Sequence, residues 1–122
     1  MNANTNRSAE ARLAELGISL PTPAAPVAAY VPSRLVPAGE GLAVLVISGQ
    51  IPLREGKLIA TGIVPSGVSL EIARECARQC TLNGLAAARA AVGSLDRIVS
   101  VTRVRWISGK SAAASPGRGG RR

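Results

Sequence analysis

The residues best suited to chemistry are gathered in one short segment, Ser48-Gly49-Gln50-Ile51-Pro52. It follows the apolar run Leu42–Ile47, so a hydroxyl, a flexible backbone and an amide stand at the end of a predicted strand. Strand ends of this kind often line ligand pockets. The alternative is a plain turn, in which the Ser48 hydroxyl bonds its own backbone and Gly49 adopts a positive φ.

Other routes to catalysis are poorly supported by the residues present. The sequence has no histidine, so the common nucleophile–base pairs cannot be built. Most of the seven acidic residues have positions typical of helix caps or solvated helix faces. The cysteines Cys76 and Cys80 are four residues apart in a helical pattern, and we interpret both as small buried apolar residues. No phosphate-binding loop, dinucleotide motif or metal-ligand pattern is present, so we expect neither cofactor nor metal.

The net charge of +8 comes mainly from the C-terminal end of the chain. Residues 101–122 contain six basic residues and no acidic one, whereas residues 1–100 contain nine basic and seven acidic residues. RNA binding through this basic tail is therefore one hypothesis. Trp106 is the only aromatic residue there, so the sequence indicates no platform for stacking bases, and we do not expect nucleic acid as the main partner.

The elements before the Ser48 segment follow from capping and periodicity. Residues 8–17 are predicted to form a short helix, capped by Ser8 and ended by a glycine, and a Pro-rich connector follows. Tyr30–Pro37 and Leu42–Ile47 are predicted strands, joined by a turn at residues 39–41. Leu42–Ile47 is apolar on both faces, which predicts a helix against one face and a subunit partner against the other.

The elements after it are a hairpin, a helix and a strand. Residues 51–61 read as a hairpin around Arg54-Glu55-Gly56. Val68–Val92 is the clearest helix, with Ser69 as its N-cap and Gly93 as its stop. Ile98–Ile107 is rich in β-branched residues and is predicted to be a third main strand. The solvent face of the helix is expected to hold Glu71, Arg74, Glu75, Arg78 and Arg89.

Together these elements predict an α+β domain in which one long helix covers antiparallel strands. Residues 1–27 are expected to be a short helix and connector, residues 28–107 the domain, and residues 108–122 a disordered tail rich in Gly, Ala and Arg. The first seven residues are polar and no apolar signal region follows, and the longest apolar run is too short to cross a bilayer. A cytoplasmic protein without membrane association is therefore expected.

Several motifs, in order, resemble the opening two-thirds of a Rid-type domain, the YjgF-like reactive-intermediate or imine deaminases formerly called endoribonuclease L-PSP. The resemblance covers residues 10–104. The matching segments are Tyr30-Val31-Pro32, Ile47–Pro52, Gly56–Leu58, Gly62–Val64, Ala73–Ala77, Leu82–Ala87 and Gly93–Val99.

This resemblance implies a chorismate-mutase-like fold and a homotrimer with clefts between subunits. It also implies hydrolysis of 2-imino acids to 2-oxo acids and ammonia, with a small imino acid or related metabolite as the partner. By the same resemblance Tyr30 and Ser48 match pocket-lining positions, with Gly49 beside them, and Asn83 matches a structural position on the helix. These residues are expected to bind substrate, and no catalytic residue is assigned.

The chain departs from the family after Asp96. The family supplies an Arg for the substrate carboxylate and a Glu to position water late in its sequence, whereas this chain has no acid after Asp96. Arg103 and Arg105 do not fall in the family's Arg motif. The second helix and last strands are expected to be missing, through a shift of reading frame near residues 105–108 or a natural truncation. Impaired imine hydrolysis, a non-catalytic ligand-binding module of the same fold, and RNA binding through the tail all stay open.

Overall fold

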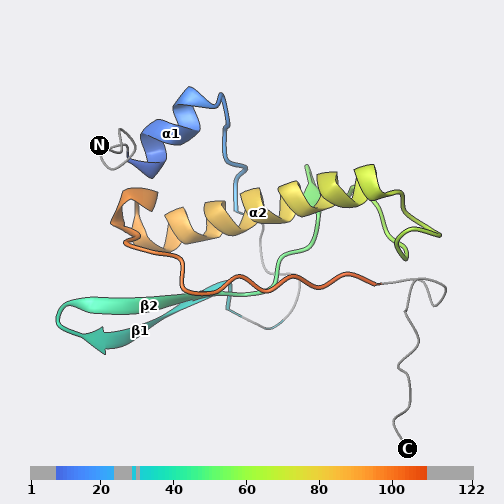
Figure 1. The fold of residues 1–122 in the computed structure, drawn as a ribbon. Helices are drawn as coiled ribbons and strands as arrows, with labels where there is room; N and C mark the ends of the chain where they lie inside the picture. The colour runs from blue at the N-terminus through green and yellow to red at the C-terminus, as the bar shows by residue number, and fades with distance from the viewer. Residues whose placement is uncertain (1–7, 24–28, 30, 110–122) are drawn as a thin grey trace, which may run out of the picture.

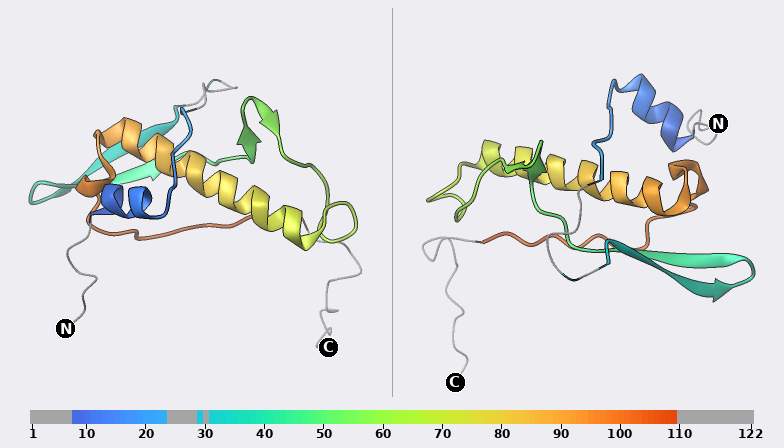
Figure 2. Two further views of the ribbon diagram at one scale, coloured as in Figure 1. Left: turned by 90° about the horizontal axis from the view of Figure 1, so that it is seen from above. Right: turned by 180° about the vertical axis from the view of Figure 1, so that it is seen from behind.

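A computed structural model describes residues 8–23, 29 and 31–109 of the chain. In chain order the elements are α1 (Ala9–Glu15), β1 (Ser33–Gly39), β2 (Leu42–Ile47), β3 (Leu53–Arg54), β4 (Lys57–Leu58), α2 (Leu70–Val92) and the short 3-10 helix η1 (Leu95–Arg97). Figures 1 and 2 show α2 between α1 on one side and the β1–β2 hairpin with the extended residues 98–109 on the other. The predicted α+β class is confirmed.

Both hairpins form where turn residues tolerate a positive φ. β1 and β2 are antiparallel. Gly39, the last residue of β1, has a φ of 85°, and the turn residues Glu40 and Gly41 have φ values of 53° and 74°. β3 and β4 are joined through Glu55 and Gly56, at φ values of 51° and 79°. Two successive positive φ values match the right-handed twist of the flanking strands, and glycine adopts them without steric cost.

The helices begin and end as their caps predict. The Ser8 Oγ accepts a hydrogen bond from the Ala11 N–H at 3.1 Å, and the Ser69 Oγ accepts one from the Ile72 N–H at 3.3 Å. Each bond pairs a donor that the first helical turn leaves open. Gly93 ends α2 at a φ of 88°. Neither α1 nor α2 combines the length and apolarity that a membrane span requires.

The core is small and made mostly of short side chains. Among the described residues the buried apolar positions are Val68, Ala86, Ala88 and Leu95. Leu95 is 3% exposed and is the largest of the four side chains. Aromatic residues make up only 2% of the chain, so large side chains contribute little to the core. Small alanine side chains on α2 allow the helix to pack close to the segments beneath it.

The predicted burial of β2 is found on one face only. Leu45 and Ile47 are half-buried, and their alternation with exposed residues indicates that they face α2, which contacts β2. On the other face Leu42, Val44 and Val46 are 57%, 44% and 53% exposed. In a single chain this outer face has no cover, and the subunit partner expected there stays a prediction.

The prediction of a third main strand at residues 98–107 is wrong for the single chain. The segment is extended and runs beneath α2, but among the described residues its backbone joins no ladder. The next backbone hydrogen bond beyond it runs from the Val64 N–H to the Gly109 carbonyl, at 3.2 Å. Val99 and Ile107 are each 85% exposed. β-Branched residues favour an extended backbone, but a strand also needs a neighbour to pair with.

Three predictions fall wholly or partly outside the described residues. Tyr30 is not described, and β1 is observed from Ser33 rather than from Tyr30. Part of the Pro-rich connector and residues 110–122 of the basic tail are also outside.

Candidate functional site

The end of β2 is fastened to the segment that precedes β1. The Ser48 Oγ donates to the Val31 carbonyl at 2.5 Å, and the Ser48 N–H donates to the Pro32 carbonyl at 3.0 Å. The simple-turn alternative is therefore wrong for Ser48, whose hydroxyl bonds a residue 17 positions earlier. The hydroxyl proton is committed to Val31, but the oxygen can still accept a hydrogen bond from a ligand.

Gly49 and Gln50 present the free polar groups at this strand end. Gly49 is exposed and does not take a positive φ, and no atom lies within 4 Å of where its Cβ would be. Within the described residues the backbone N–H groups of Gly49 and Gln50 donate no hydrogen bond. Two adjacent unpaired donors beside the Ser48 oxygen can bind a carboxylate or carbonyl oxygen.

The Gln50 side chain braces the strand end. Its Nε2 donates to the Ser48 carbonyl at 2.9 Å. Its Cγ lies 3.8 Å from the position that a Cβ on Gly84 would occupy, which is an ordinary van der Waals distance, so the Gln50 side chain lies against α2 at Gly84. Gln50 belongs to the predicted motif, but the sequence assigns it no role. Its contacts with the Ser48 carbonyl and with Gly84 could not be predicted from the local sequence.

Asn83 fixes the chain immediately after the strand end. Its Nδ2 donates to the carbonyls of Ile51 and Leu53, at 3.1 and 3.0 Å. This agrees with the structural role expected for Asn83. Ser48–Leu53 is therefore attached to α2 at two neighbouring positions on the helix.

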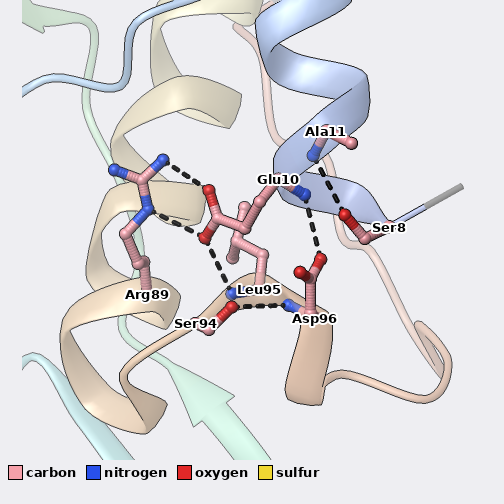
Figure 3. A network of polar contacts seen from close by, with 7 residues as sticks. All are labelled: Ser8, Glu10, Ala11, Arg89, Ser94, Leu95 and Asp96. Atoms are coloured by element: carbon pink, nitrogen blue, oxygen red, sulfur yellow. Dashed lines mark hydrogen bonds and ion pairs between the residues drawn. The ribbon is translucent and has the colours of Figure 1, made fainter.

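A second polar cluster joins α1 to the end of α2, and both of its carboxylates accept hydrogen bonds (Figure 3). Glu10 accepts from the Arg89 Nε and Nη2 at 3.1 and 3.0 Å, and also from the Leu95 N–H at 3.0 Å. The Asp96 Oδ1 accepts from the Glu10 N–H at 3.0 Å. The placement of Arg89 on the solvent face was wrong, because Arg89 lies half-buried against α1. We call Glu10, Arg89, Leu95 and Asp96 the α1 clamp.

Glu75 binds a residue of another element rather than a neighbour on its own helix. Glu75 and Arg78 have ion-pair spacing, but the Glu75 Oε1 instead accepts from the Arg54 Nη1 at 2.8 Å. Arg54 reaches α2 from the β3–β4 hairpin, a contact that helical spacing does not reveal. No hydrogen bond or ion pair links an acidic residue to Ser48, Gly49 or Gln50 within the described part of the chain.

Comparisons with known proteins agree on the architecture. No protein-family model matches the chain. Protein TCP17 of Trypanosoma cruzi is 35% identical over 94 residues, which make up 77% of this chain and 56% of that protein. The crystal structure of a “putative endoribonuclease” from Shewanella oneidensis MR-1 matches with a TM-score of 0.65 and 32% identity, over 75% of this chain and 57% of that one.

This chain has part of the YjgF-like fold. A protein of unknown function from Agrobacterium tumefaciens matches with a TM-score of 0.56 and 39% identity, over 73% of this chain and 51% of that chain. The chain therefore spans about half the length of the proteins it matches. The predicted fold class is confirmed, with an antiparallel hairpin under one long helix.

The two cysteines of this YjgF-like chain are free and half-buried, rather than fully buried as expected. Burial, and then the neighbouring Cys76, raise the pKa of the Cys80 thiol above its ordinary value. No group of three or more metal-binding side chains occurs among residues 8–23, 29 and 31–109. The Cys80 thiol therefore lacks the depressed pKa that a nucleophilic cysteine needs.

Alkylation should report the raised pKa of Cys80 directly. Because the thiolate is the reactive form, we expect iodoacetamide to modify folded Cys80 more slowly than the urea-unfolded chain at mildly alkaline pH. The difference should shrink as the pH rises through the folded-state pKa. Mass spectrometry of tryptic peptides measures this, because cleavage after Arg78 separates Cys76 from Cys80. Equal rates in the folded and unfolded chains at every pH would contradict the prediction.

Proposed function

We propose that this chain is a Rid-type protein whose Ser48–Gly49 strand end binds a small 2-imino acid or a related 2-oxo acid. The observation that carries the proposal is a pair of N–H groups, at Gly49 and Gln50, that have no acceptor among the described residues and lie beside the hydrogen-bonded Ser48 hydroxyl. Such donors suit the carboxylate and the planar C=N or C=O group of these metabolites. Tyr30 is proposed to line the same pocket, by resemblance alone.

Hydrolysis of the imine to a 2-oxo acid and ammonia is the proposed activity of this fold. The reaction needs a cation for the carboxylate and a group that positions water. In this chain Glu10 pairs with Arg89, Glu75 pairs with Arg54, and the sequence has no acid after Asp96. We therefore propose weak turnover at best for this polypeptide.

The second candidate is a non-catalytic ligand-binding module of the same fold. It is favoured by the positions of the ion-paired acids. Glu10 and Glu75 bind arginines of other elements, and Glu15 binds an arginine of its own helix, so among the described residues none of these acids lies at the strand end. Binding without turnover would distinguish this candidate from the deaminase.

Two subunits are proposed to form the complete pocket. The outer face of β2 exposes Leu42, Val44 and Val46, and exposed contiguous apolar surface of this kind marks an interface. A homotrimer is the assembly that the resemblance implies. Analytical ultracentrifugation should give three times the 12.4 kDa chain mass, and a monomer at micromolar concentration would contradict this assembly.

The test of function compares turnover with binding. An amino-acid oxidase generates the 2-imino acid in place, and ammonia release above the uncatalysed rate measures hydrolysis. Titration with pyruvate, a stable 2-oxo acid, measures binding by calorimetry. We expect Ser48→Ala to weaken pyruvate binding about tenfold, because one hydrogen bond contributes roughly 1–1.5 kcal/mol.

The matched control is Arg78→Gln, an exposed position on α2 outside the proposed site. It should bind pyruvate as the wild type does. Ammonia release would support the deaminase, and binding alone would support the module. If the protein shows no binding and no turnover, both candidate functions are overturned. Cleavage of a single-stranded RNA oligonucleotide would instead favour the endoribonuclease activity that the name of the Shewanella protein states.

A further inference from the structure

A line of four polar side chains connects the surface of α2 to the strand end. The Arg54 Nη1 donates to the Glu75 Oε1 at 2.8 Å, and the Arg54 Nε donates to the Gln79 Oε1 at 3.1 Å. The Gln79 Nε2 then donates to the Asn83 Oδ1 at 2.9 Å. We call Glu75, Arg54, Gln79 and Asn83 the amide relay. It ends where Asn83 donates to the chain that follows the strand end.

The direction of every hydrogen bond in the relay is set at both of its ends, by the Arg54 guanidinium and by the carbonyls of Ile51 and Leu53. A guanidinium group only donates, so the oxygen of the Gln79 amide must face it. The nitrogen of Gln79 then faces Asn83, and the oxygen of Asn83 must accept from it. The Asn83 nitrogen is thereby turned toward the two backbone carbonyls, which only accept. Gln79 is 6% exposed, so water cannot easily replace the missing partner if one amide reverses.

The relay acts on the same backbone that carries the unpaired N–H groups. Asn83 fixes the carbonyls of Ile51 and Leu53, and the Gln50 side chain lies against its neighbour Gly84. Gln50 in turn holds the Ser48 carbonyl. The strand end therefore depends on α2 for its geometry, while the N–H groups of Gly49 and Gln50 stay unpaired among the described residues.

We propose that Arg54, Gln79 and Asn83 are positioning residues that hold Ser48–Gln50 in one ligand-ready geometry. The ligand itself rests on the proposed function, whereas the effect on the backbone does not. A preformed donor pair binds more tightly than one that must be ordered on binding, because the ordering cost is already met.

The decisive variant is Asn83→Asp. It keeps the shape of the side chain but places carboxylate oxygens against the carbonyls of Ile51 and Leu53. We expect pyruvate to bind about tenfold more weakly, because two part-exposed hydrogen bonds are replaced by acceptor–acceptor contacts. The amide signals of Gly49 and Gln50 in a 1H–15N NMR spectrum should broaden or split, while those of α2 remain sharp. Arg78→Gln should change neither measurement.

A second variant guards against failure of the first to fold. Arg54 is partly exposed, so Arg54→Gln should fold. Glutamine can donate or accept, so only the carbonyls of Ile51 and Leu53 still orient the relay, and we expect the amide signal of Gly49 to shift or broaden. Single, sharp wild-type signals for Gly49 and Gln50 in both variants would overturn the positioning role. If the wild type neither binds pyruvate nor releases ammonia, the proposed function fails, and the amide signals alone still decide the role of the relay.

Discussion

Replacing Leu95 with alanine is expected to lower the free energy of unfolding by about 2–4 kcal/mol, the usual cost of removing a buried leucine. Leu95 is 3% exposed, and it is the bulkiest buried side chain in the described part of the chain. The other buried apolar residues are valine and alanine, so little neighbouring bulk is available to collapse into the space. In a small core one such cavity is a large fraction of total stability.

Urea unfolding followed by far-UV circular dichroism measures this change. Leu70→Ala is the matched control, because the same side chain in the first turn of α2 is 57% exposed. We expect the control to lose less than about 1 kcal/mol, in line with surface substitutions. Equal losses in the two variants would show that Leu95 is not a core residue.

Replacing Glu10 with glutamine should have the second largest effect, a loss of about 2 kcal/mol. Glu10 accepts three hydrogen bonds in the α1 clamp, two of them from the Arg89 guanidinium. Hydrogen bonds to charged groups contribute about 1.5–3 kcal/mol to the free energy of unfolding. The side chains of Arg89 and Glu10 are 39% and 30% exposed, so solvent screening reduces the contribution of these bonds. The glutamine keeps the volume but removes the charge.

The control for Glu10→Gln is Glu71→Gln. Glu71 also lies in the first turn of a helix, but it is exposed, and its contribution is limited to the helix dipole, about 0.5 kcal/mol. High salt should reduce the difference in unfolding free energy between wild type and Glu10→Gln only in part, because the Glu10–Arg89 pair is half-buried. If high salt abolishes this difference in unfolding free energy, the Glu10–Arg89 pair behaves as an ordinary surface ion pair.

Features set by neighbouring residues could be predicted from the sequence. Ser8 and Ser69 cap their helices, and Gly93 ends α2, because each acts within one turn of its own position. The glycine-containing turns were found for the same reason. The fold class also followed from the order of the elements and from the resemblance. A TM-score of 0.65 to a solved structure confirms the fold class.

Features that join distant residues could not be predicted. Arg89 looked solvated on its own helix, but its partner Glu10 lies 79 positions earlier. Residues 98–107 have strand composition, but composition does not supply a pairing neighbour. For the candidate site, the segment Ser48–Gln50 was found, whereas the Val31 acceptor and the support from Asn83 depend on the folded chain.

The α1 clamp also determines when α1 can dock during synthesis and folding of the chain. Glu10 and its partners are separated by 79 to 86 positions, and ribosomes add about 5–20 residues per second, so α1 waits roughly 4–17 s for Arg89 and Asp96 to be synthesised. Its seven residues are too few to hold a stable helix in isolation. We therefore expect α1 to dock last, so that loss of the clamp accelerates unfolding and leaves the folding rate almost unchanged.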